Sequence, residues 1–209
     1  MPHAVRANPI PTGLRALDQE LGTGGWPAGR IVELFGDAIE AKRLLLHLAL
    51  ASAQRMGGGA ALLCPEGQTG SDTALRASVD LQRLVILHPH DEAEALAAAC
   101  DLTQTGTMAA VAVCGFWFAS ELEGDAFVKL SASARRTGTL VLFCSPPWGP
   151  SAQAGHTTGT VLRRFADVRV CILPPHESPG RPYSVTLDIA TNRVGGRRGR
   201  LTTTLPHGP

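Results

Sequence analysis

The sequence has no apolar run long enough to cross a bilayer as a helix, and no hydrophobic signal segment near its start. It has five cysteines, and none of them shows the C-x-x-C spacing of a metal or redox motif. We therefore expect a soluble, cytoplasmic protein with no membrane partner. Four cysteines end or lie within apolar, strand-like runs, which is typical of buried free thiols.

Lysine is scarce, because Lys42 and Lys129 are the only two among 19 basic residues. The formal net charge is only +1, but the charges are unevenly distributed. Residues 61–130 contain ten acidic residues and three basic ones, whereas residues 160–209 contain eight arginines and three acidic residues. The C-terminal quarter is therefore the only part of the sequence that offers a footprint for a polyanion.

Apolar strand-like runs alternate with helical patterns along most of the chain. Strands are predicted at 31–36, 60–64, 84–87, 108–113 and 140–144, and helices at 42–56, 91–102 and 121–136. This alternation predicts an α/β fold with a mostly parallel sheet flanked by helices. An alternating strand at 183–189, a glycine-rich turn and a strand at 201–205 predict a C-terminal antiparallel β-hairpin.

The length of 209 residues fits one globular domain. Residues 1–9 are short, polar and without periodicity, which predicts a loose N-terminal tail. We expect one core domain at 10–205, with a mobile loop at 145–159 and a tail at 206–209.

The segment from Ile31 to Arg43 has the spacing of a phosphate-binding loop, G-x-x-x-x-G-K-[ST], between a strand and a helix. Gly36 and Lys42 occupy the positions of the first glycine and the lysine. Ala41 and Arg43 stand where the second glycine and the hydroxyl residue belong. A Cβ atom at position 41 crowds the closest approach of the backbone to a phosphate. The sequence therefore has the frame of the loop without all of its chemistry.

Asp37 and Glu40 add two carboxylates to the same loop. One negative charge about 4 Å from a phosphate costs roughly 4 kcal/mol at an effective dielectric near 20, which is about three orders of magnitude in affinity. Lys42 and Arg43 can offset these charges by pairing with them, but such pairing occupies the phosphate site. We therefore expect no cofactor and no tightly bound Mg-ATP, with weak ATP binding left open.

The residues before this loop carry a resemblance to a known family. They are Thr12-Gly13, Leu17-Asp18, the turn Gly24-Gly25-Trp-Pro27-Ala-Gly29-Arg30 and the strand Ile31-Val-Glu33. In this order they resemble the ATPase core of the bacterial recombinase RecA, and further matches reach Thr204. The resemblance implies a RecA-like P-loop NTPase core. RecA has an N-terminal helix that docks on the neighbouring subunit, and we expect none in residues 1–9, hence a monomer.

The RecA-like core also implies where catalytic residues belong. Glu66 follows the second strand, at the place of the catalytic glutamate, and either orients a water or is a solvated loop or capping residue. Cys114 and Pro146 take the positions of the Walker B acid and the γ-phosphate sensor. His88 and His90 lack nearby carboxylate or thiol partners, so we expect no metal. The resemblance thus implies a protein that is not an enzyme, with Glu66 as the one weak catalytic candidate.

Arginines near the C-terminus are candidates for contacts with nucleic acid. The candidate residues are Arg163, Arg164, Arg193, Arg197, Arg198 and Arg200. They either bind the phosphates of single-stranded DNA weakly and without sequence preference, or form a solvated hairpin tip. Trp148 either stacks on a base or holds its loop against the core or a partner.

RecA-like folds with a decayed ATP site are typical of the ImuA family, which this chain resembles. ImuA proteins act in damage-induced (SOS) mutagenesis and translesion synthesis, and are encoded with the polymerase-like ImuB. The resemblance implies a non-catalytic adaptor that binds an ImuB-like partner through a helix like the N-terminal helix of RecA. RecA and single-stranded DNA are further candidate partners. Two alternatives remain, a SulA-type cell-division inhibitor and a weak DNA-stimulated recombination ATPase.

Overall fold

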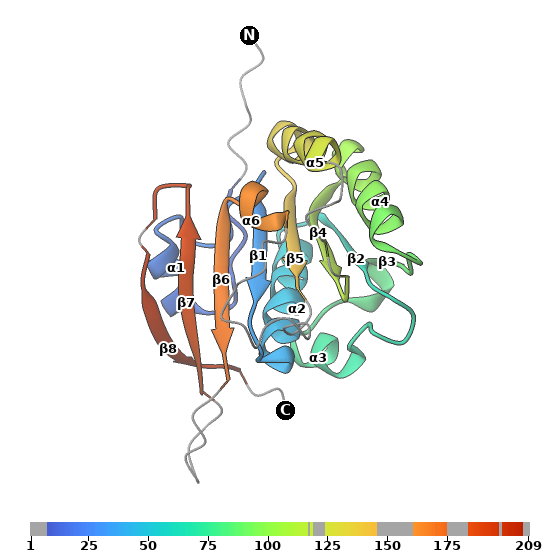
Figure 1. Cartoon of the computed structure of the whole chain (residues 1–209). Coiled ribbons are helices and arrows are strands. Elements are labelled where there is room, and N and C mark those ends of the chain that lie inside the picture. The colour runs from blue at the N-terminus through green and yellow to red at the C-terminus, as the bar shows by residue number, and fades with distance from the viewer. Residues whose placement is uncertain are drawn as a thin grey trace.

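The computed structural model describes residues 8–116, 118, 124–145, 161–174, 184–196 and 198–206. An eight-stranded sheet runs through this part of the chain in the order β3-β2-β4-β5-β1-β6-β7-β8 (Figure 1). The strands are β1 (Ile31–Phe35), β2 (Gly59–Leu63), β3 (Leu84–Leu87), β4 (Met108–Cys114), β5 (Leu140–Cys144), β6 (Val168–Leu173), β7 (Ser184–Asn192) and β8 (Arg200–Thr204). Strands β1 to β6 are parallel, and β7 and β8 continue the sheet antiparallel. The predicted fold class, including the C-terminal hairpin, is confirmed.

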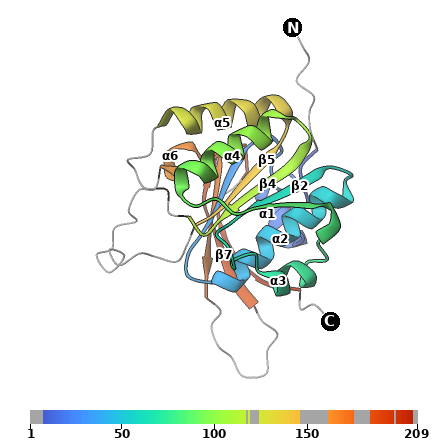
Figure 2. The ribbon, with the colours of Figure 1, turned by 90° about the vertical axis from the view of Figure 1, so that its right-hand side faces the viewer.

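Helices cover both faces of the sheet (Figure 2). One face carries α1 (Arg15–Leu21), α2 (Ile39–Arg55) and α3 (Ser71–Arg76), and the other carries α4 (Glu92–Gln104), α5 (Gly124–Thr137) and α6 (Leu162–Phe165). A 3-10 turn, η1 (Leu81–Arg83), leads into β3. Each face has its own cluster of buried apolar side chains. Within the described residues, no helix is both long and apolar enough to cross a membrane.

Most of the predicted elements are present within a few residues of their predicted bounds. Helix α2 begins at Ile39 and not at Lys42, and the short helices α1 and α3 were not predicted. Helix α1 buries Leu17 and Leu21 and ends at Gly22, whose φ of 71° is left-handed. The proposed mobile loop lies outside the described residues apart from Ser145.

The order of the strands places a switch point beside β1. The chain leaves β1 to build β2 and β3 on the far side of β4 and β5, and later returns to form β6 on the other side of β1. In parallel α/β sheets, ligands bind outside the carboxyl ends of the strands at such a point. The ends of β1, β4 and β5 are therefore the place to look for a functional site.

Candidate functional site

Gly36 sets the path of the chain after β1. Its φ is +101°, and a Cβ atom placed there would lie 2.4 Å from the carbonyl oxygen of Ile172 on β6. The backbone N–H of Ala38 donates to the same oxygen at 3.4 Å. Only glycine fits this close approach, so the sequence-predicted Gly36 is required by packing against β6 whether or not a phosphate is bound.

Because α2 begins early, backbone N–H groups that a phosphate-binding loop leaves free are hydrogen-bonded within the chain. The N–H of Lys42 donates to the carbonyl of Ala38 at 3.0 Å, and that of Ile39 donates to the carbonyl of Asp37 at 2.9 Å. In a phosphate-binding loop, successive N–H groups point at the anion instead. Ala41 is fully buried, and its methyl group belongs to the hydrophobic cluster under the sheet. The alanine is therefore part of the core as well as an obstacle to phosphate.

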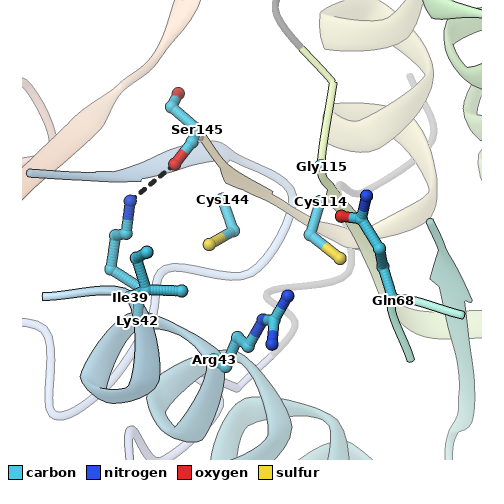
Figure 3. Close-up of a pocket in the computed structure, with 8 residues that line it drawn as sticks. All are labelled: Ile39, Lys42, Arg43, Gln68, Cys114, Gly115, Cys144 and Ser145. Atoms are coloured by element: carbon cyan, nitrogen blue, oxygen red, sulfur yellow. Dashed lines mark hydrogen bonds between the residues drawn. The ribbon is translucent and has the colours of Figure 1, made fainter. Parts of the chain in front are cut away.

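The side chain of Lys42 is held inside the protein. It is 1% exposed, and its Nζ donates to the carbonyl oxygen of Ser145 at 2.6 Å (Figure 3). The hydroxyl of Ser145 donates to Oε1 of Glu33 at 2.9 Å, and Nε of Arg169 donates to Oε2 of the same carboxylate. The guanidinium of Arg169 also lies 4.5 Å from the centre of the Phe35 ring. These contacts form a buried polar network that joins α2, β5, β1 and β6.

Burial lowers the pKa of Lys42, because desolvation disfavours the ammonium form. The thiol of Cys144 and the carboxylates of Asp37 and Glu33 act in the opposite direction. Glu33 itself is 1% exposed on the central strand β1, and its carboxylate also forms an ion pair with Arg169. The network thus supplies the cation of Lys42 with an acceptor and a counter-charge from the protein itself.

A cavity of about 270 Å³ opens at this edge of the sheet. Its lining consists of Ile39, Lys42, Arg43, Gln68, Cys114, Gly115, Cys144 and Ser145 (Figure 3). This volume lies just below the roughly 300–1,000 Å³ of ordinary small-molecule sites. None of the described lining residues carries a carboxylate, and Cys114 ends β4 where the resemblance places a magnesium-binding acid. The cavity is therefore cationic and lined by thiols.

Arg43 occupies the position of the phosphate-loop hydroxyl and points toward the two cavity thiols in Figure 3. Its Nη1 lies 3.7 Å from the carboxylate of Glu40, one turn back on α2. The predicted pairing of a loop cation with a loop acid is present at this position. Across the described residues, no group of three or more His, Cys, Asp or Glu side chains is placed to hold a metal ion.

Glu66 lies in the exposed loop after β2 and does not line the cavity. His88 is near it, and the pKa of His88 is raised, first by a hydrogen bond to the carbonyl of Cys64 and to a smaller degree by Glu66. The Nδ1 atom of His88 is 3.0 Å from that carbonyl oxygen. Glu66 thus lies in an exposed loop near an exposed histidine, outside the ring of residues around Lys42.

The structure brings together only some of the candidate arginines for nucleic acid. The guanidinium of Arg193 donates to the carbonyl oxygens of Arg164 at 2.8 Å and Arg163 at 3.3 Å, so these three arginines are neighbours. Arg200 is an ion-pair partner of Asp188 at 3.0 Å, and Arg198 is exposed on the hairpin. Arg197 and Trp148 lie outside the described residues.

Two further arginines extend this cluster and were not among the sequence candidates. Arg30 and Arg135 both approach Oδ1 of Asp167, at 3.3 and 3.4 Å. Asp167 is buried, and its carbonyl accepts the N–H of Arg193 at 2.8 Å. The partners are 137 and 32 residues apart in sequence, so no local spacing could have revealed the contact. We call Arg30, Arg135, Arg163, Arg164 and Arg193 the arginine cluster.

Comparison with known proteins agrees with this geometry. Residues 2–139 match the model of the RecA N-terminal domain. Protein RecA of Francisella philomiragia subsp. philomiragia is 34% identical over an alignment of 187 residues, and the match covers 77% of this chain and 51% of that protein. Protein RecA of Francisella tularensis subsp. novicida is 34% identical over an alignment of 152 residues, and the match covers 64% of this chain and 42% of that protein. The chain spans about half the length of these relatives, and with its RecA N-terminal domain it belongs to the RecA family.

Proposed function

We propose that this chain is a non-catalytic RecA-like adaptor in damage-induced mutagenesis, which binds an ImuB-like, polymerase-family partner. The observation that carries the proposal is the position of Lys42. The residue that would contact a nucleotide phosphate is buried and bound to the carbonyl of Ser145. In this arrangement the RecA-like fold is kept, and the lysine that would bind a phosphate stabilises the fold instead.

The energetics favour the scaffold role over nucleotide binding. A phosphate could reach Lys42 only if the hydrogen bond to Ser145 opened, and a hydrogen bond to a charged group contributes about 1.5–3 kcal/mol. A phosphate at Lys42 would also be repelled by the carboxylate of Asp37, which lies just before α2 and is near enough to Lys42 to act on its pKa. The cavity lining offers Cys114 and Cys144 in place of an acid that could hold magnesium through its water shell. These terms act in the same direction, which argues against the recombination ATPase alternative.

Calorimetric titration with Mg-ATP tests this part of the proposal. We expect binding no tighter than about millimolar, or −4 kcal/mol, and no turnover with or without single-stranded DNA. A micromolar dissociation constant would contradict the proposal, as would turnover that Lys42→Ala abolishes. Arg55→Ala is a matched control, because Arg55 is a basic residue at the far end of α2 that is absent from the cavity lining.

The adaptor part of the proposal needs a surface for a partner, and the β3 edge of the sheet is the best candidate. Among the described strands, β3 pairs only with β2 (Figure 1). Val85 and Ile86 on β3 are each 37% exposed, and Leu81 in the turn that leads into β3 is 46% exposed. An unprotected apolar edge strand is a template for an added strand or an apolar helix. We infer that the RecA-like segment of an ImuB-like partner docks here.

The opposite edge of the sheet has a different character. Strand β8 exposes Arg200, Thr202 and Thr204, and charged or polar side chains protect an edge from pairing. The contrast supports β3 as the edge that receives a partner.

A pair of matched variants tests the docking edge. We expect Ile86→Lys to weaken binding of an ImuB-like protein at least about tenfold, the effect of roughly 1.4 kcal/mol at one apolar contact. Val128→Lys is the control, since Val128 is 54% exposed on α5, a helix of the covering layer. Equal binding by Ile86→Lys and wild type would refute the docking site. Neighbouring genes for an ImuB-like protein would separate this function from that of a SulA-type inhibitor.

A second candidate function is weak binding of single-stranded DNA at the arginine cluster. The supporting observation is that arginines from four segments lie together. Arg30 and Arg135 approach the carboxylate of Asp167. Arg193 donates to the carbonyl oxygens of Arg163 and Arg164 in α6. Arginine is suited to phosphate because its planar guanidinium can donate two parallel hydrogen bonds.

A further inference from the structure

Three cysteines follow one another across neighbouring strands at the cavity edge. Cys114 ends β4 and Cys144 ends β5, and the two are register partners. Cys64 comes directly after β2, whose last residue Leu63 is the register partner of Val113. All three belong to the apolar cluster on the α2 face of the sheet. Because neighbouring strands are about 4.8 Å apart, Cys64 and Cys114 are within the Cα separation of roughly 4.4–6.8 Å that a disulfide requires.

The loops after β2 and β4 hold these two cysteines together. Gly115 has a φ of +81°, and a Cβ atom placed there would lie 2.7 Å from Pro65 Cδ and 2.7 Å from Gln68 Oε1. The two chain segments are thus in direct contact just beyond the thiols. We propose that Cys64 and Cys114 form an oxidation site, a dithiol that hydrogen peroxide converts into a disulfide.

The cavity gives a small oxidant access to the pair. Cys114 lines the cavity, and Figure 3 shows its sulfur on the same side as the guanidinium of Arg43. Cys64 lies behind it, fully buried and next to His88. Hydrogen peroxide is far smaller than a cavity of about 270 Å³. The reagent therefore meets the Cys114 side of the pair first.

The surroundings favour a thiolate within the pair. The hydrogen bond with Cys114 lowers the pKa of Cys64 to about 7, against the effect of burial, and His88 and Arg43 act in the same direction as that bond. The same hydrogen bond and burial raise the pKa of Cys114. The pair therefore loses one proton near neutral pH and keeps the second. The thiolate is therefore on Cys64, and Cys114 is the thiol that reacts in the second step.

The reaction balances with one equivalent of peroxide. The thiolate of the pair attacks an oxygen of hydrogen peroxide, so that an S–O bond forms, the O–O bond breaks, and hydroxide leaves and is protonated to water. The sulfur is oxidised by two electrons to a sulfenic acid. The second thiol then attacks that sulfur, the S–S bond forms, and its proton leaves with the hydroxyl group as a second water. Two thiols and one peroxide thus give one disulfide and two waters.

The other cysteines provide a comparison within the same chain. Cys100 and Cys171 are more exposed than the pair, but burial raises the pKa of each, and Cys100 donates to the carbonyl of Ala126 at 3.7 Å. Cys144 is buried beside Cys114, and burial raises its pKa as well. Exposure alone predicts that Cys100 and Cys171 react first. The proposed dithiol site predicts instead that Cys64 and Cys114 react first.

The size of the effect follows from thiol chemistry. At pH 7 a thiol with a pKa near 7 is roughly fifty times more ionised than one near 9, but its thiolate is less nucleophilic by a factor of about eight. Because burial raises the pKa of Cys100 further, the pair should react at least about fivefold faster than Cys100.

Peroxide treatment of the whole chain, followed by alkylation of free thiols and peptide mass spectrometry, tests the proposal. We expect a disulfide-linked peptide pair containing Cys64 and Cys114 before Cys100 or Cys171 is modified. Cys64→Ala and Cys114→Ala should each abolish the linked pair, and Cys100→Ala is the control that should leave it unchanged. The wild-type measurement alone decides the matter if a variant fails to fold. Faster reaction at Cys100 or Cys171, a Cys114–Cys144 linkage, or a pair that stays reduced would overturn the proposal.

Discussion

Glu33 is predicted to be the residue on which the buried network depends. Its carboxylate accepts from Arg169 and from the hydroxyl of Ser145, whose carbonyl in turn accepts from Lys42. Glu33→Gln keeps the shape of the side chain and removes its charge, so two buried or half-buried cations lose their counter-charge. Breaking a buried ion pair by removing one partner costs about 3–5 kcal/mol. For a chain of this size that corresponds to a fall in Tm of roughly 6–20 °C.

Lys42→Met is the informative companion to Glu33→Gln. It removes one charged hydrogen bond but also removes the cost of burying an ammonium group, and it leaves the pair of Glu33 and Arg169 intact. We expect its free energy of unfolding to lie within about 1.5 kcal/mol of wild type. Because burial lowers the pKa of Lys42 below 10.5, the unfolded chain binds more protons just below that value. Wild-type stability should rise with pH in that window, and Lys42→Met should lose this rise.

Urea unfolding followed by circular dichroism measures both variants, and an unchanged m-value checks that the transition is still comparable. A cost below about 1 kcal/mol for Glu33→Gln would refute the central role of Glu33, because removing a buried counter-charge costs more than that. Greater destabilisation by Lys42→Met than by Glu33→Gln would refute it as well. That result would make the lysine, and not the glutamate, the centre of the network.

Two further predictions concern charge. Single-stranded DNA should bind weakly, and the logarithm of the binding constant should fall with the logarithm of the salt concentration with a slope of roughly −2 to −3. Combined serine substitutions at Arg163, Arg164 and Arg193 should make this slope less steep in a fluorescence-anisotropy titration. Arg200→Ser is the control and should leave the slope nearly unchanged, because the guanidinium of Arg200 is paired with Asp188. An unaltered slope in the triple variant would exclude the cluster. Burial lowers the pKa of His47 from 6.5 to about 4, so the unfolded chain binds the extra proton and stability falls as the pH drops through that window. Urea unfolding at pH 7 and 4.5 should differ by roughly 2–3 kcal/mol from this group, and His47→Gln should reduce the difference.

Much of the fold could be predicted because its central strands are short apolar runs that end at turn residues. The run from Ile31 to Phe35 and the run from Leu140 to Cys144 are buried strands, as expected. The start of α2 was wrong for an instructive reason. The spacing of a phosphate-binding loop placed residues 39–41 in the loop, but Glu40 and Ala41 are strong helix formers and join the helix. The helix propensity of these residues and the burial of Ala41 in the core therefore decided the conformation of residues 39–41, and the spacing of the motif did not.

The sequence predicts where the candidate site lies but not which residues contact one another there. Gly36 and Lys42 lie at the cavity edge because a strand, a loop and a helix follow each other there. The acceptor of Lys42 is 103 residues away, and the two groups that bind Glu33 are 112 and 136 residues away. Such contacts depend on the order of strands in the sheet, and no periodicity or spacing in the sequence encodes that order. The same holds for the register of Cys114 with Cys144.

Several independent features of the site support our proposal that this chain does not bind nucleotide tightly, and they go beyond the individual substitutions. Replacing Ala41 by glycine would remove one methyl group from the core, but the N–H of Lys42 would still be engaged with the carbonyl of Ala38. Replacing Arg43 by threonine would restore a hydroxyl, but the lysine beside it would still be bound to Ser145. An acid at position 114 would then stand next to the thiols of Cys64 and Cys144, without a metal ligand opposite it in the described cavity lining. Each of these substitutions would leave the other features that oppose nucleotide binding unchanged. The early helical turn of α2, the hydrogen bond of Lys42 to Ser145 and the cysteines at the strand ends are independent of one another. Lys42 therefore has a structural reason to be present, as a cross-link between α2 and β5, that requires no nucleotide at all.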